Sequence, residues 1–528
     1  MMRLEQHFPL RDPALKHLAE NAEGSMVYPG GMLTSPRAVE KRARHLKGWT
    51  GDRKALHSWL SEQNSFADLH PNQKKHLGSV ASPDTLFLLT GQQPGLLGGP
   101  MLWYCKAMTC AAWARKLSLQ LNRSVIPLFW VAGDDSDLAE CNVVEWLEPE
   151  ADRTRMSLDF PHPLAAIPMS LRRPDDWEWK KLFQVIGLNW DAESVKKIQS
   201  CYTPGCSLTE GFLQLAQSFL AEEGMLFVDG LSASGRAQPF LQRLIREAPQ
   251  FQKALGQGIR RMQDARLSVQ VPLRPGSVPA FLFEDGVRKR LFFSDTQPQR
   301  VFTQGAEAHD LLPAIEKHAL LHSALSRPLV AETLFPVLGH ILGPGEIRYF
   351  GELSEVFPAF GFFHPLLAPR QHLLVSPEKD WKRLQDLGIL AKGFPELDPS
   401  QIRSKLVELA WERHSASKTF PMTTFKKSIQ ELRQFQATLP PYGALDAGLR
   451  KLEGAFERYR LSARQAVFTG KEAEALTELL PLLRWLGHGF QDRHLNLFSL
   501  RKALGEEGFK IFSTMLREGE GQLTVALY

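Results

Sequence analysis

Four carboxylates follow one of the most apolar segments of the chain. The segment 133–140 (GDDSDLAE) comes directly after the run SVIPLFWVA at 124–132. Carboxylates at this spacing can bind a metal–nucleotide complex, hold a substrate amine or act as a base. The alternative is helix capping, because acidic side chains favour the N–H groups of a helix N-terminus. Four carboxylates exceed what one cap requires, so we predict a functional loop, with Asp135 and Asp137 as catalytic candidates and Asn142 as a binding candidate.

A glycine-rich segment, 91–100 (GQQPGLLGGP), follows a second apolar run, TLFLLT at 85–90. Backbone N–H groups in such a loop, together with a helix N-terminus, can hold a phosphate or a carboxylate, and glutamine amides can donate and accept. The alternative is a tight turn that needs glycine for its backbone geometry. The segment matches neither GxGxxG nor GxxxxGK[ST], so a dinucleotide-binding motif or a P-loop is not supported. The binding candidates here are Gly91, Gln92, Gln93 and Gly95.

Two further segments could complete a site. Lys106 lies five residues into the helix expected after the glycine loop, where it could reach a phosphate. The alternative is a surface lysine whose stem packs on apolar neighbours. Downstream, Gly343 and Gly345 would let a ligand approach the backbone, and Glu346 could pair with an amine. The alternative for this segment is a helix start with an acidic first turn. We take Lys106 as a catalytic candidate and, as binding candidates, Gly343, Gly345, Glu346 and Tyr349.

No metal site is predicted. His318 and His322 are four residues apart in a segment, 307–323, that we expect to be helical, and no third ligand accompanies them. The five cysteines form no CxxC pair, and their odd number fits a reducing cytosol better than a disulfide framework.

These candidates need elements that bring them together. A strand–turn–helix–strand (βαβ) unit is predicted from the apolar run 85–90, the glycine loop, the helix 101–117 and the apolar run 124–132. This unit predicts an α/β fold. Such units place their loops at the carboxyl edge of the sheet, where ligands bind. Further elements expected are a strand at 225–229, a hairpin at 281–293 that turns at Asp285-Gly286, and a helix that opens within 342–352.

The composition excludes several classes of protein. The chain has 528 residues, which suggests two to four domains, and 63 basic against 58 acidic residues give a net charge of +5. That excess is too small for a dedicated nucleic-acid binder. The longest uncharged stretch, 85–105, holds four glycines and two prolines and would make a poor membrane span, and the N-terminus lacks the apolar region of a signal peptide. We therefore expect a cytoplasmic protein with no membrane or nucleic-acid partner.

A heptad pattern occurs late in the chain. Its apolar positions, spaced 4-3-4-3-4-3, are Leu445, Leu449, Leu452, Phe456, Tyr459, Ala463 and Ala466. Compatible upstream positions are Phe425, Ile429, Leu432 and Leu439. The prolines and glycine between the two sets predict a long antiparallel helical hairpin; the alternative is an ordinary helical bundle. Because a projecting hairpin with an apolar seam often pairs with a copy of itself, we expect a homodimer.

Four segments together resemble one family, the cysteine-adding enzymes (cysteine ligases) of bacillithiol biosynthesis. They occur in order between residues 85 and 500 and read LTGQQPGLLGGPMLWYCKA, IPLFWVAGDDSDLAECN, RPLVAETLFPVLGHILGPGEIRYFGEL and FQDRHLN. The same segments add, as binding candidates, Trp130, Arg327, Gln491, Arg493 and Asn496.

The resemblance implies a Rossmann-like core similar to those of class I aminoacyl-tRNA synthetases and nucleotidylyltransferases, with connective insertions. It also implies an antiparallel coiled coil that makes a dimer. We expect the core at 1–375 with an insertion at 145–220, the helical coiled-coil domain at 376–485, and a C-terminal return to the core at 486–528. The implied reaction joins cysteine through an amide to the amine of glucosaminyl malate.

An amine does not displace hydroxide from a carboxylate at a useful rate, so the cysteine carboxyl must first be activated. The implied fold favours a cysteinyl adenylate, and therefore ATP, ADP or another adenine nucleotide, with magnesium. In this picture the glycine loop holds an anion and Lys106 neutralises phosphate charge. Asp135 and Asp137 bind the cysteine ammonium or orient the attacking amine. Glu346 and Tyr349 close the opposite wall, which the C-terminal segment supports.

The chain departs from the family pattern. The family's acidic loop usually reads Glu-Asp-His-Asp, whereas residues 134–137 are Asp-Asp-Ser-Asp, and Asn142-Val143 stands where Asn-His often follows. If that histidine is the general base, this chain needs another. The sequence also lacks HxGH and a KMSKS loop. Two other hypotheses therefore stay open: a nucleotidylyltransferase acting on another small molecule, and a non-catalytic coiled-coil scaffold.

Overall fold

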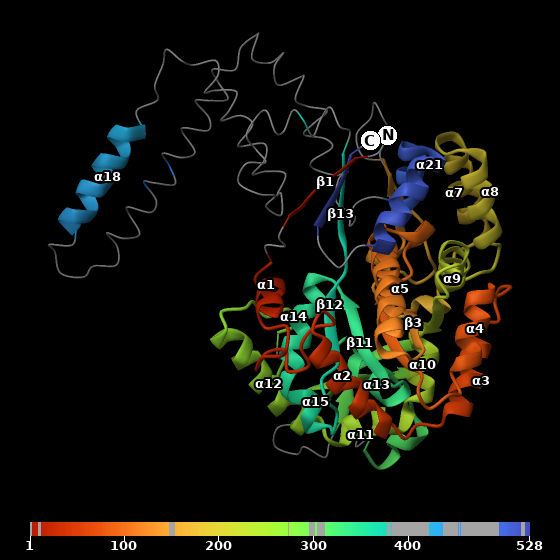
Figure 1. Ribbon diagram of the computed structural model, residues 1–528, viewed down its shortest axis with the longest axis horizontal. Coiled ribbons are helices and arrows are strands. Elements are labelled where there is room, and N and C mark those ends of the chain that lie inside the picture. Colours follow the sequence, from red (N-terminus) through yellow and green to blue (C-terminus); the bar gives the residue numbers. More distant parts are fainter. Residues whose placement is uncertain are drawn as a thin grey trace, which may run out of the picture. The chain divides into compact units, whose positions relative to one another are not determined.

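The computed structural model divides the chain into two compact units, residues 1–376 with 490–528 and residues 377–489 (Figure 1). The structure describes residues 3–8, 12–146, 154–272, 274–294, 301–303, 312–376, 422–436, 496–518 and 523–527, and the single residues 382, 452 and 455. The candidate site lies in the first unit.

A five-stranded parallel sheet forms the centre of the first unit, in the order β12-β11-β2-β3-β6. Its strands are β2 (Leu86–Gln92), β3 (Val125–Val131), β6 (Leu226–Asp229), β11 (Val337–Leu342) and β12 (Leu366–Pro369). The chain runs from β2 through β3 to β6 on one side and then returns to place β11 on the other side of β2. The strand order therefore reverses between β2 and β11, and such a switch point is where open α/β sheets bind ligands.

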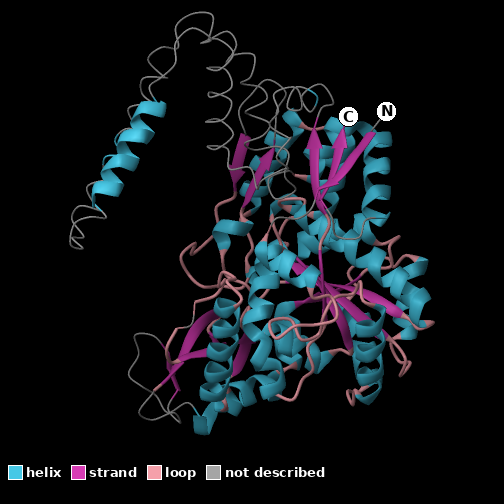
Figure 2. Ribbon diagram, turned by 60° about the vertical axis from the view of Figure 1, so that its left-hand side comes forward, coloured by secondary structure: helices cyan, strands magenta, loops and turns pink. Residues whose placement is uncertain are grey.

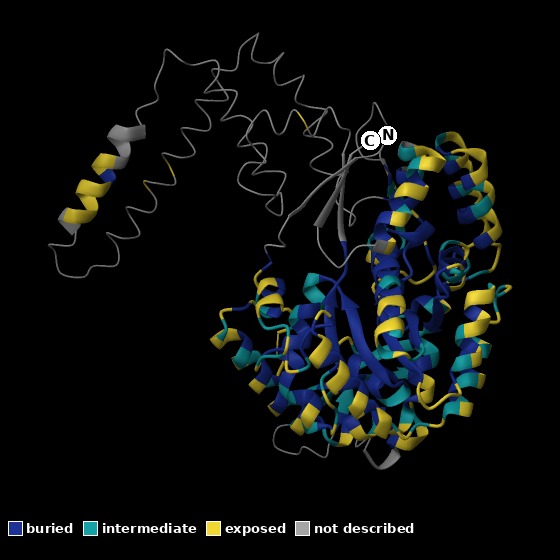
Figure 3. Ribbon diagram, viewed as in Figure 1, coloured by how far each residue is buried: buried dark blue, intermediate teal, exposed yellow. Residues whose placement is uncertain are grey.

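Both faces of this sheet are covered, as the apolar runs predicted (Figure 3). In β2 the side chains of Leu86 and Leu88 enter one core, whereas those of Phe87 and Leu89 enter the core on the opposite face. This alternation follows from the two-residue repeat of a strand. The α/β, Rossmann-like class predicted from the sequence is confirmed.

The helices pack in two layers. One core receives residues from α2 (Pro36–His45), α5 (Leu102–Leu121), α9 (Leu208–Leu220) and α21 (Leu497–Glu518). The other receives residues from α1 (Pro13–Glu20), α3 (Arg53–Gln63), α4 (Pro71–Ser79), α10 (Gly230–Arg236), α11 (Gln238–Arg246), α12 (Ala248–Asp264), α13 (Arg327–Leu334), α14 (Pro344–Glu352) and α15 (Val356–Ala359). Short 3-10 turns are η1 (Leu46–Gly48), η2 (Leu96–Gly98) and η5 (Leu353–Glu355). Within the described residues, no helix has the length and apolar character needed to cross a membrane.

A third, smaller core lies between β3 and β6 in the sequence. Large aromatic side chains dominate it, among them Trp146, Trp179, Trp190 and Tyr202. The contributing elements are α6 (Leu138–Cys141), β4 (Val143–Trp146), β5 (Thr154–Ser157), η3 (Met169–Leu171), α7 (Asp176–Asn189) and α8 (Ala192–Cys201). Since η2 and Phe498 also enter this core, it fixes the glycine loop to the C-terminal segment.

A separate antiparallel sheet has the order β10-β7-β8-β9; Figure 2 shows the strands of all the sheets in magenta. Its strands are β7 (Ser277–Glu284), β8 (Val287–Phe293), β9 (Val301–Thr303) and β10 (Ala319–His322). The predicted hairpin is confirmed: it turns at Asp285 and Gly286, both of which have positive φ. The helix predicted for 307–323 is wrong in its described part, because η4 (Leu312–Lys317) is a short 3-10 turn and β10 pairs with β7.

A small sheet joins the two ends of the chain, with β14 (Leu523–Leu527) between β1 (Arg3–Phe8) and β13 (His372–Ser376). The described residues between β1 and residue 80 contain the helices α1 to α4 and no further strand. In the second unit, α18 (Met422–Gln436) is a helix that contains three of the upstream heptad positions. The heptad set at 445–466 lies outside the described residues except for Leu452, so the coiled coil stays a prediction.

Candidate active site

A cavity of about 550 Å³ lies at the carboxyl end of β3. The acidic loop, here residues 133–140, forms one side, and β7, β8 and the segment leading into α13 form the others. Its polar lining carries both charge signs: Asp134, Asp135, Ser136, Asp137, Arg274, Arg288, Arg290, His322, Ser323 and Arg327. The predicted acidic loop therefore meets a basic surface contributed by other parts of the chain.

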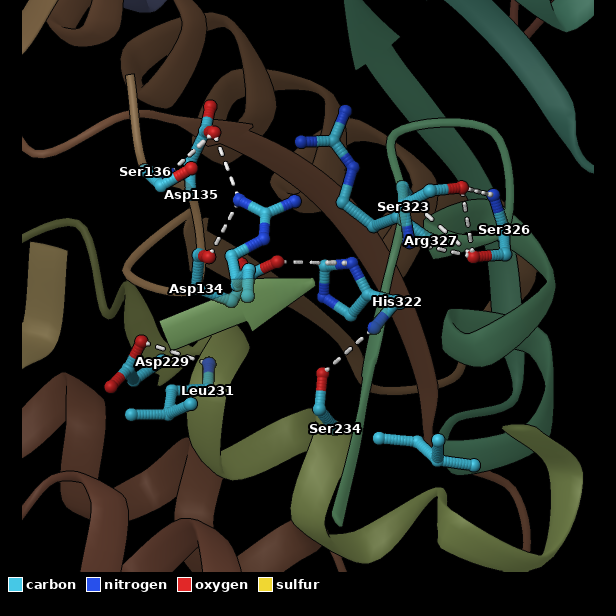
Figure 4. Close-up of polar contacts among 12 residues, drawn as sticks. Asp134, Asp135, Ser136, Asp229, Leu231, Ser234, His322, Ser323, Ser326 and Arg327 are labelled. Atoms are coloured by element: carbon cyan, nitrogen blue, oxygen red, sulfur yellow. Dashed lines mark hydrogen bonds and ion pairs between the residues drawn. The ribbon is translucent and has the colours of Figure 1, made fainter. Parts of the chain in front are cut away.

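Asp135 lies between two of the sequence segments that were singled out separately. Its Oδ2 accepts a hydrogen bond from Gln93 Nε2 at 2.8 Å, and its Oδ1 lies 3.1 Å from Arg288 Nη1. The same Arg288 nitrogen donates to the carbonyl of Asp134 at 2.8 Å (Figure 4). Burial alone would raise the pKa of Asp135, but Arg288 and Gln93 together with a backbone N–H lower it. Asp135 is thus an ionised carboxylate and a weak base.

Asp134 is buried and faces a histidine that the sequence analysis did not select. His322 Nδ1 lies 3.2 Å from Asp134 Oδ2 (Figure 4). The centroid of its ring lies 5.3 Å from that of the Trp130 ring. Burial lowers the pKa of His322; Asp134 acts in the opposite direction, and Arg327 and Arg288 lower the pKa further. His322 is therefore a neutral imidazole near pH 7.

The other predicted residues of the acidic loop have different surroundings. Asp137 is exposed on the cavity lining at the start of α6, where its side chain makes no capping hydrogen bond. Asn142 follows α6 and donates from Nδ2 to the carbonyl of Leu158 at 2.9 Å. Asn142 does not line the cavity, and its contact joins the loop to the smaller aromatic core.

Lys106 lies at the switch point between β2 and β11, and it is buried rather than on the surface. Its Nζ lies 2.6 Å from Glu346 Oε2 and donates to Gln92 Oε1 at 2.9 Å and to the carbonyl of Gly91 at 3.0 Å. An ammonium has three N–H donors, so these acceptors account for all of them. The surface-lysine alternative is wrong, because Glu346 supplies a buried counter-charge.

Glu346 connects Lys106 to the cavity. It caps α14 by accepting from the N–H of Gly343 at 2.8 Å, as the helix-start alternative proposed, and its Oε1 lies 3.5 Å from Arg327 Nη2. Arg327 in turn donates to Tyr349 Oη at 2.5 Å and lines the cavity. Gly345 is the second residue of α14. We call Lys106, Arg327, Glu346 and Tyr349 the switch-point network.

Two arginines on the cavity wall carry no counter-charge from the part of the chain that the structure describes. The side chains of Arg274 and Arg290 have no hydrogen bond or ion pair with any residue in the described ranges, and both line the cavity. Burial lowers the pKa of Arg290, and the nearby charges of Arg274 and Arg288 lower it further. Crowded guanidinium groups of this kind favour an anion between them. We call Arg274 and Arg290 the open arginine pair.

Of the three C-terminal binding candidates, the structure describes one, Asn496. Asn496 is buried and donates to the carbonyls of Leu97 and Gly99 at 3.3 and 3.4 Å, so it holds the glycine loop rather than the large cavity. Gly95 precedes η2 in that loop. Gln491 and Arg493 lie outside the described residues.

The residues that the sequence analysis missed had recognisable signals. Arg288 and Arg290 are two apart in a strand and so share a face, and both lie against Phe281. His322 ends a short apolar strand that we had assigned to a helix. Over the part of the chain that is described, no group of three or more His, Cys, Asp or Glu side chains could hold a metal ion.

Comparison with known proteins places this geometry in context. Residues 15–371 match the family described as "Bacillithiol biosynthesis BshC, N-terminal Rossmann-like domain". A protein named "Putative cysteine ligase BshC" from Shouchella clausii is 28% identical over 475 residues, which cover 84% of each chain. A protein of the same name from Carboxydothermus hydrogenoformans is 26% identical over 506 residues, which cover 91% of this chain and 90% of the relative.

Another protein of that name, from Symbiobacterium thermophilum, is 30% identical over 374 residues, or 64% of this chain and 66% of the relative. Among solved structures, one described as "putative arginyl t-RNA synthetase" from Campylobacter jejuni aligns with 85% of this chain and 98% of its own, at 11% identity and a TM-score of 0.22. A likeness at that score carries no argument about the fold.

Proposed function

The chain belongs to the BshC family of bacillithiol biosynthesis, and from this premise we propose that it is a ligase that joins the carboxyl of cysteine to the amine of glucosaminyl malate. The product is an amide. A free carboxylate is a poor acyl donor, so the proposal includes activation of the cysteine carboxyl by an adenine nucleotide, with magnesium.

The observation that carries the proposal is the opposition of charges across one cavity. Asp135 and Asp137 face the cavity from the acidic loop, and the open arginine pair faces it from the other side. Cysteine carries an ammonium group, and glucosaminyl malate carries two carboxylates. The carboxylates of the loop suit the ammonium, and the guanidiniums suit the malate end. Held in this way, the carboxyl of one substrate would lie near the amine of the other.

The clamp on Asp135 supports this assignment. Because Gln93 and Arg288 hold the carboxylate by hydrogen bonds from two different segments, its orientation is fixed before a substrate binds. A pre-oriented, ionised carboxylate binds an ammonium without paying the entropy of ordering a free side chain. The glycine loop therefore acts through Gln93, and Gln92 acts through its bond to Lys106.

Within the described residues of the cavity, Arg274 and Arg290 are the cations without a counter-charge, and the proposal assigns them to the carboxylates of glucosaminyl malate. A nucleotide, when bound, would supply the acyl activation, and its phosphate would need other partners. Residues of the chain bind and orient the substrates and take up the proton released by the amine.

Two further proposals concern assembly and location. The heptad spacing of 445–466 and the helix α18 support a homodimer formed through the helical unit at 377–489. The composition supports a cytoplasmic protein, because its five cysteines form no CxxC pair and are odd in number.

The test is a complete reaction. Purified protein is incubated with cysteine, glucosaminyl malate and ATP, and the amide product is sought by mass spectrometry. ATP–pyrophosphate exchange with cysteine alone tests the activation step separately. We expect the product and cysteine-dependent exchange; the absence of the product with every nucleotide tried would refute the ligase proposal.

A matched pair of variants locates the reaction. Asp135→Asn removes the charge that would hold the ammonium, and we expect the KM for cysteine to rise about 10-fold or more, as for the loss of a charged hydrogen bond. Asp159→Asn changes an acid outside the cavity lining and should leave the KM unchanged. Equal KM values for the two variants would place cysteine elsewhere.

A further inference from the structure

The wall of the cavity carries a buried imidazole without a hydrogen bond. His322 is 2% exposed, and both of its ring nitrogens lack a hydrogen-bond partner among the residues whose positions are described. Its Nδ1 lies at ion-pair distance, 3.2 Å, from Asp134 Oδ2 (Figure 4). Buried polar groups almost always have partners, because an unpaired one costs free energy. An unpaired imidazole on the lining of a cavity therefore indicates a ligand group that completes it.

The ring is held in place from several sides. The backbone N–H of His322 donates to Ser234 Oγ at 3.3 Å, and the Trp130 ring packs on the imidazole. The hydrogen bond fixes the backbone at His322, and the Trp130 ring restricts the movement of the imidazole. A rigid, preformed position is what proton transfer to a bound substrate requires.

Asp134 reaches this position because Gly230, the first residue of α10, lacks a side chain. A Cβ on Gly230 would lie 2.1 Å from Asp134 Oδ1, so any other residue there would displace the carboxylate. Asp229, which precedes Gly230, accepts a hydrogen bond from Ser170 Oγ at 2.7 Å. Burial raises the pKa of Asp229 to about 6, and the charge of Asp134 raises it as well. Part of the Asp229 population is therefore protonated near neutral pH.

Among the described residues, three charged side chains act on the pKa of His322. Asp134 favours the protonated ring, whereas Arg288 from β8 and Arg327 from α13 disfavour it. The net effect is a lowered pKa, so the ring is neutral near pH 7, and Asp134 is the charge that favours its protonated form. The arrangement follows the logic of a histidine base that is oriented by a carboxylate.

We propose that His322, oriented by Asp134, is the general base of the ligation and accepts the proton that the attacking amine loses. This rests on the proposed function. In the step, the amine lone pair forms the N–C bond to the acyl carbon. The C–O bond to the phosphate leaving group breaks and its electron pair goes to that oxygen. One proton passes from the amine nitrogen to the neutral imidazole, which later releases it to water.

The other acids of the cavity are less suited to this role. Asp135 has a lowered pKa and is already held by Arg288 and Gln93, so it binds protons weakly. Asp137 is exposed at the loop, where water competes for its charge. His322 is the histidine of the described cavity lining.

The first test compares two histidine variants. His322→Asn keeps a polar side chain near Asp134 but cannot carry the proton. We expect kcat to fall about 10²- to 10⁴-fold, with both KM values within about threefold of the wild type. His318→Asn, four residues earlier and outside the cavity lining, should keep kcat within about twofold. If His322→Asn is folded and retains kcat, the proposal is overturned.

The pH profile separates a base from a packing residue. For the wild type, kcat should fall as the pH drops below the His322 pKa, which burial places under 6.5. His322→Asn should lose this acid limb. A variant that is slow but keeps the same limb would show that another group accepts the proton.

An NMR titration of the histidine rings tests the inference without a measurement of turnover. Histidine ring resonances are assigned through His322→Asn and titrated by NMR in the wild type and in Asp134→Asn. We expect Asp134→Asn to lower the His322 pKa, because a charge that favours the cation is lost. We also expect glucosaminyl malate to shift the His322 resonance. If the amino sugar leaves it unmoved, the general-base role fails even where the ligase reaction is observed; if the amide product is absent but the shift occurs, the proposed function fails alone.

Discussion

The switch-point network and the cavity wall are close neighbours with opposite properties. In the network, Lys106 has acceptors for all its donors, and Glu346 is shared between Lys106, Arg327 and the N-terminus of α14. On the wall, the imidazole of His322 lacks a hydrogen bond and the open arginine pair lacks a counter-charge within the described ranges. A saturated polar set can only position its surroundings. An unsaturated one has bonding capacity left for substrates.

Arg327 joins the two regions. It bonds to Tyr349 and Glu346 in the network, and it also lines the cavity. The network therefore fixes one wall of the cavity, whereas the acidic loop is fixed by Gln93 and Arg288. The comparison predicts that changes in the network affect stability first, and that changes on the wall affect kinetics first.

The largest effect is expected from Lys106→Met. This change leaves Glu346 without its principal counter-charge and leaves the carbonyl of Gly91 without a donor. Breaking a buried ion pair from one side costs about 3–5 kcal/mol, and we expect that loss in the free energy of unfolding measured in urea. The double variant Lys106→Met/Glu346→Gln should recover about half of it, because no charge is stranded. If Lys106→Met is as stable as the wild type but cannot turn over, Lys106 is catalytic and the comparison fails.

The next effect concerns the open arginine pair. Arg290→Ala should raise the KM for glucosaminyl malate about 10- to 100-fold, the usual range for a hydrogen bond to a charged group, without changing the KM for cysteine. Because the described partner of the Arg290 guanidinium is the Phe281 ring, the free energy of unfolding should change by less than about 1 kcal/mol. Steady-state kinetics with each substrate varied in turn provides the measurement. A large loss of stability would show that the pair is structural.

The sequence predicted the elements that position the site better than it predicted the contacts within it. Strands β2 and β3 are apolar on both faces, and their loops carry glycine or acids, so period and composition were sufficient. The helix α14 was also predicted, because its glycines and Glu346 are a strong local signal. Interactions between residues close in the sequence determine these features, so short segments are enough to predict them.

Contacts between distant segments were not predictable in the same way. Arg288 meets Asp135 across 153 residues, and the hairpin that carries it was predicted without any indication of where it docks. His322 was placed on a helix because a short apolar strand and a helix segment share one pattern at this length. Lys106 was ambiguous for a related reason, since its counter-charge comes from a segment 240 positions away in the chain.

A third prediction uses the pH dependence of stability. The folded-state pKa of Asp135 is lowered, so its charge stabilises the fold above the unfolded-state pKa, and that contribution is lost as the pH falls through the folded-state value. Asp135→Asn should therefore be less stable than the wild type at pH 7, by about 1 kcal/mol because the group is partly exposed. Urea unfolding at pH 7 and at about pH 3 gives the comparison. The difference should be smaller at the lower pH; a constant difference would mean that the charge of Asp135 is not what Arg288 and Gln93 stabilise.

The smallest effect separates a position near the site from one within it. Asn142 follows the acidic loop, but its amide bonds to the carbonyl of Leu158 and it does not line the cavity. Asn142→Ala should cost about 1 kcal/mol of stability, the usual value for one hydrogen bond, and should leave kcat and both KM values within about twofold. Thermal unfolding and steady-state kinetics on the same preparation measure both. A rise in either KM without a loss of stability would extend the substrate site from the cavity wall to the start of β4, and the boundary between positioning and binding residues would have to be redrawn there.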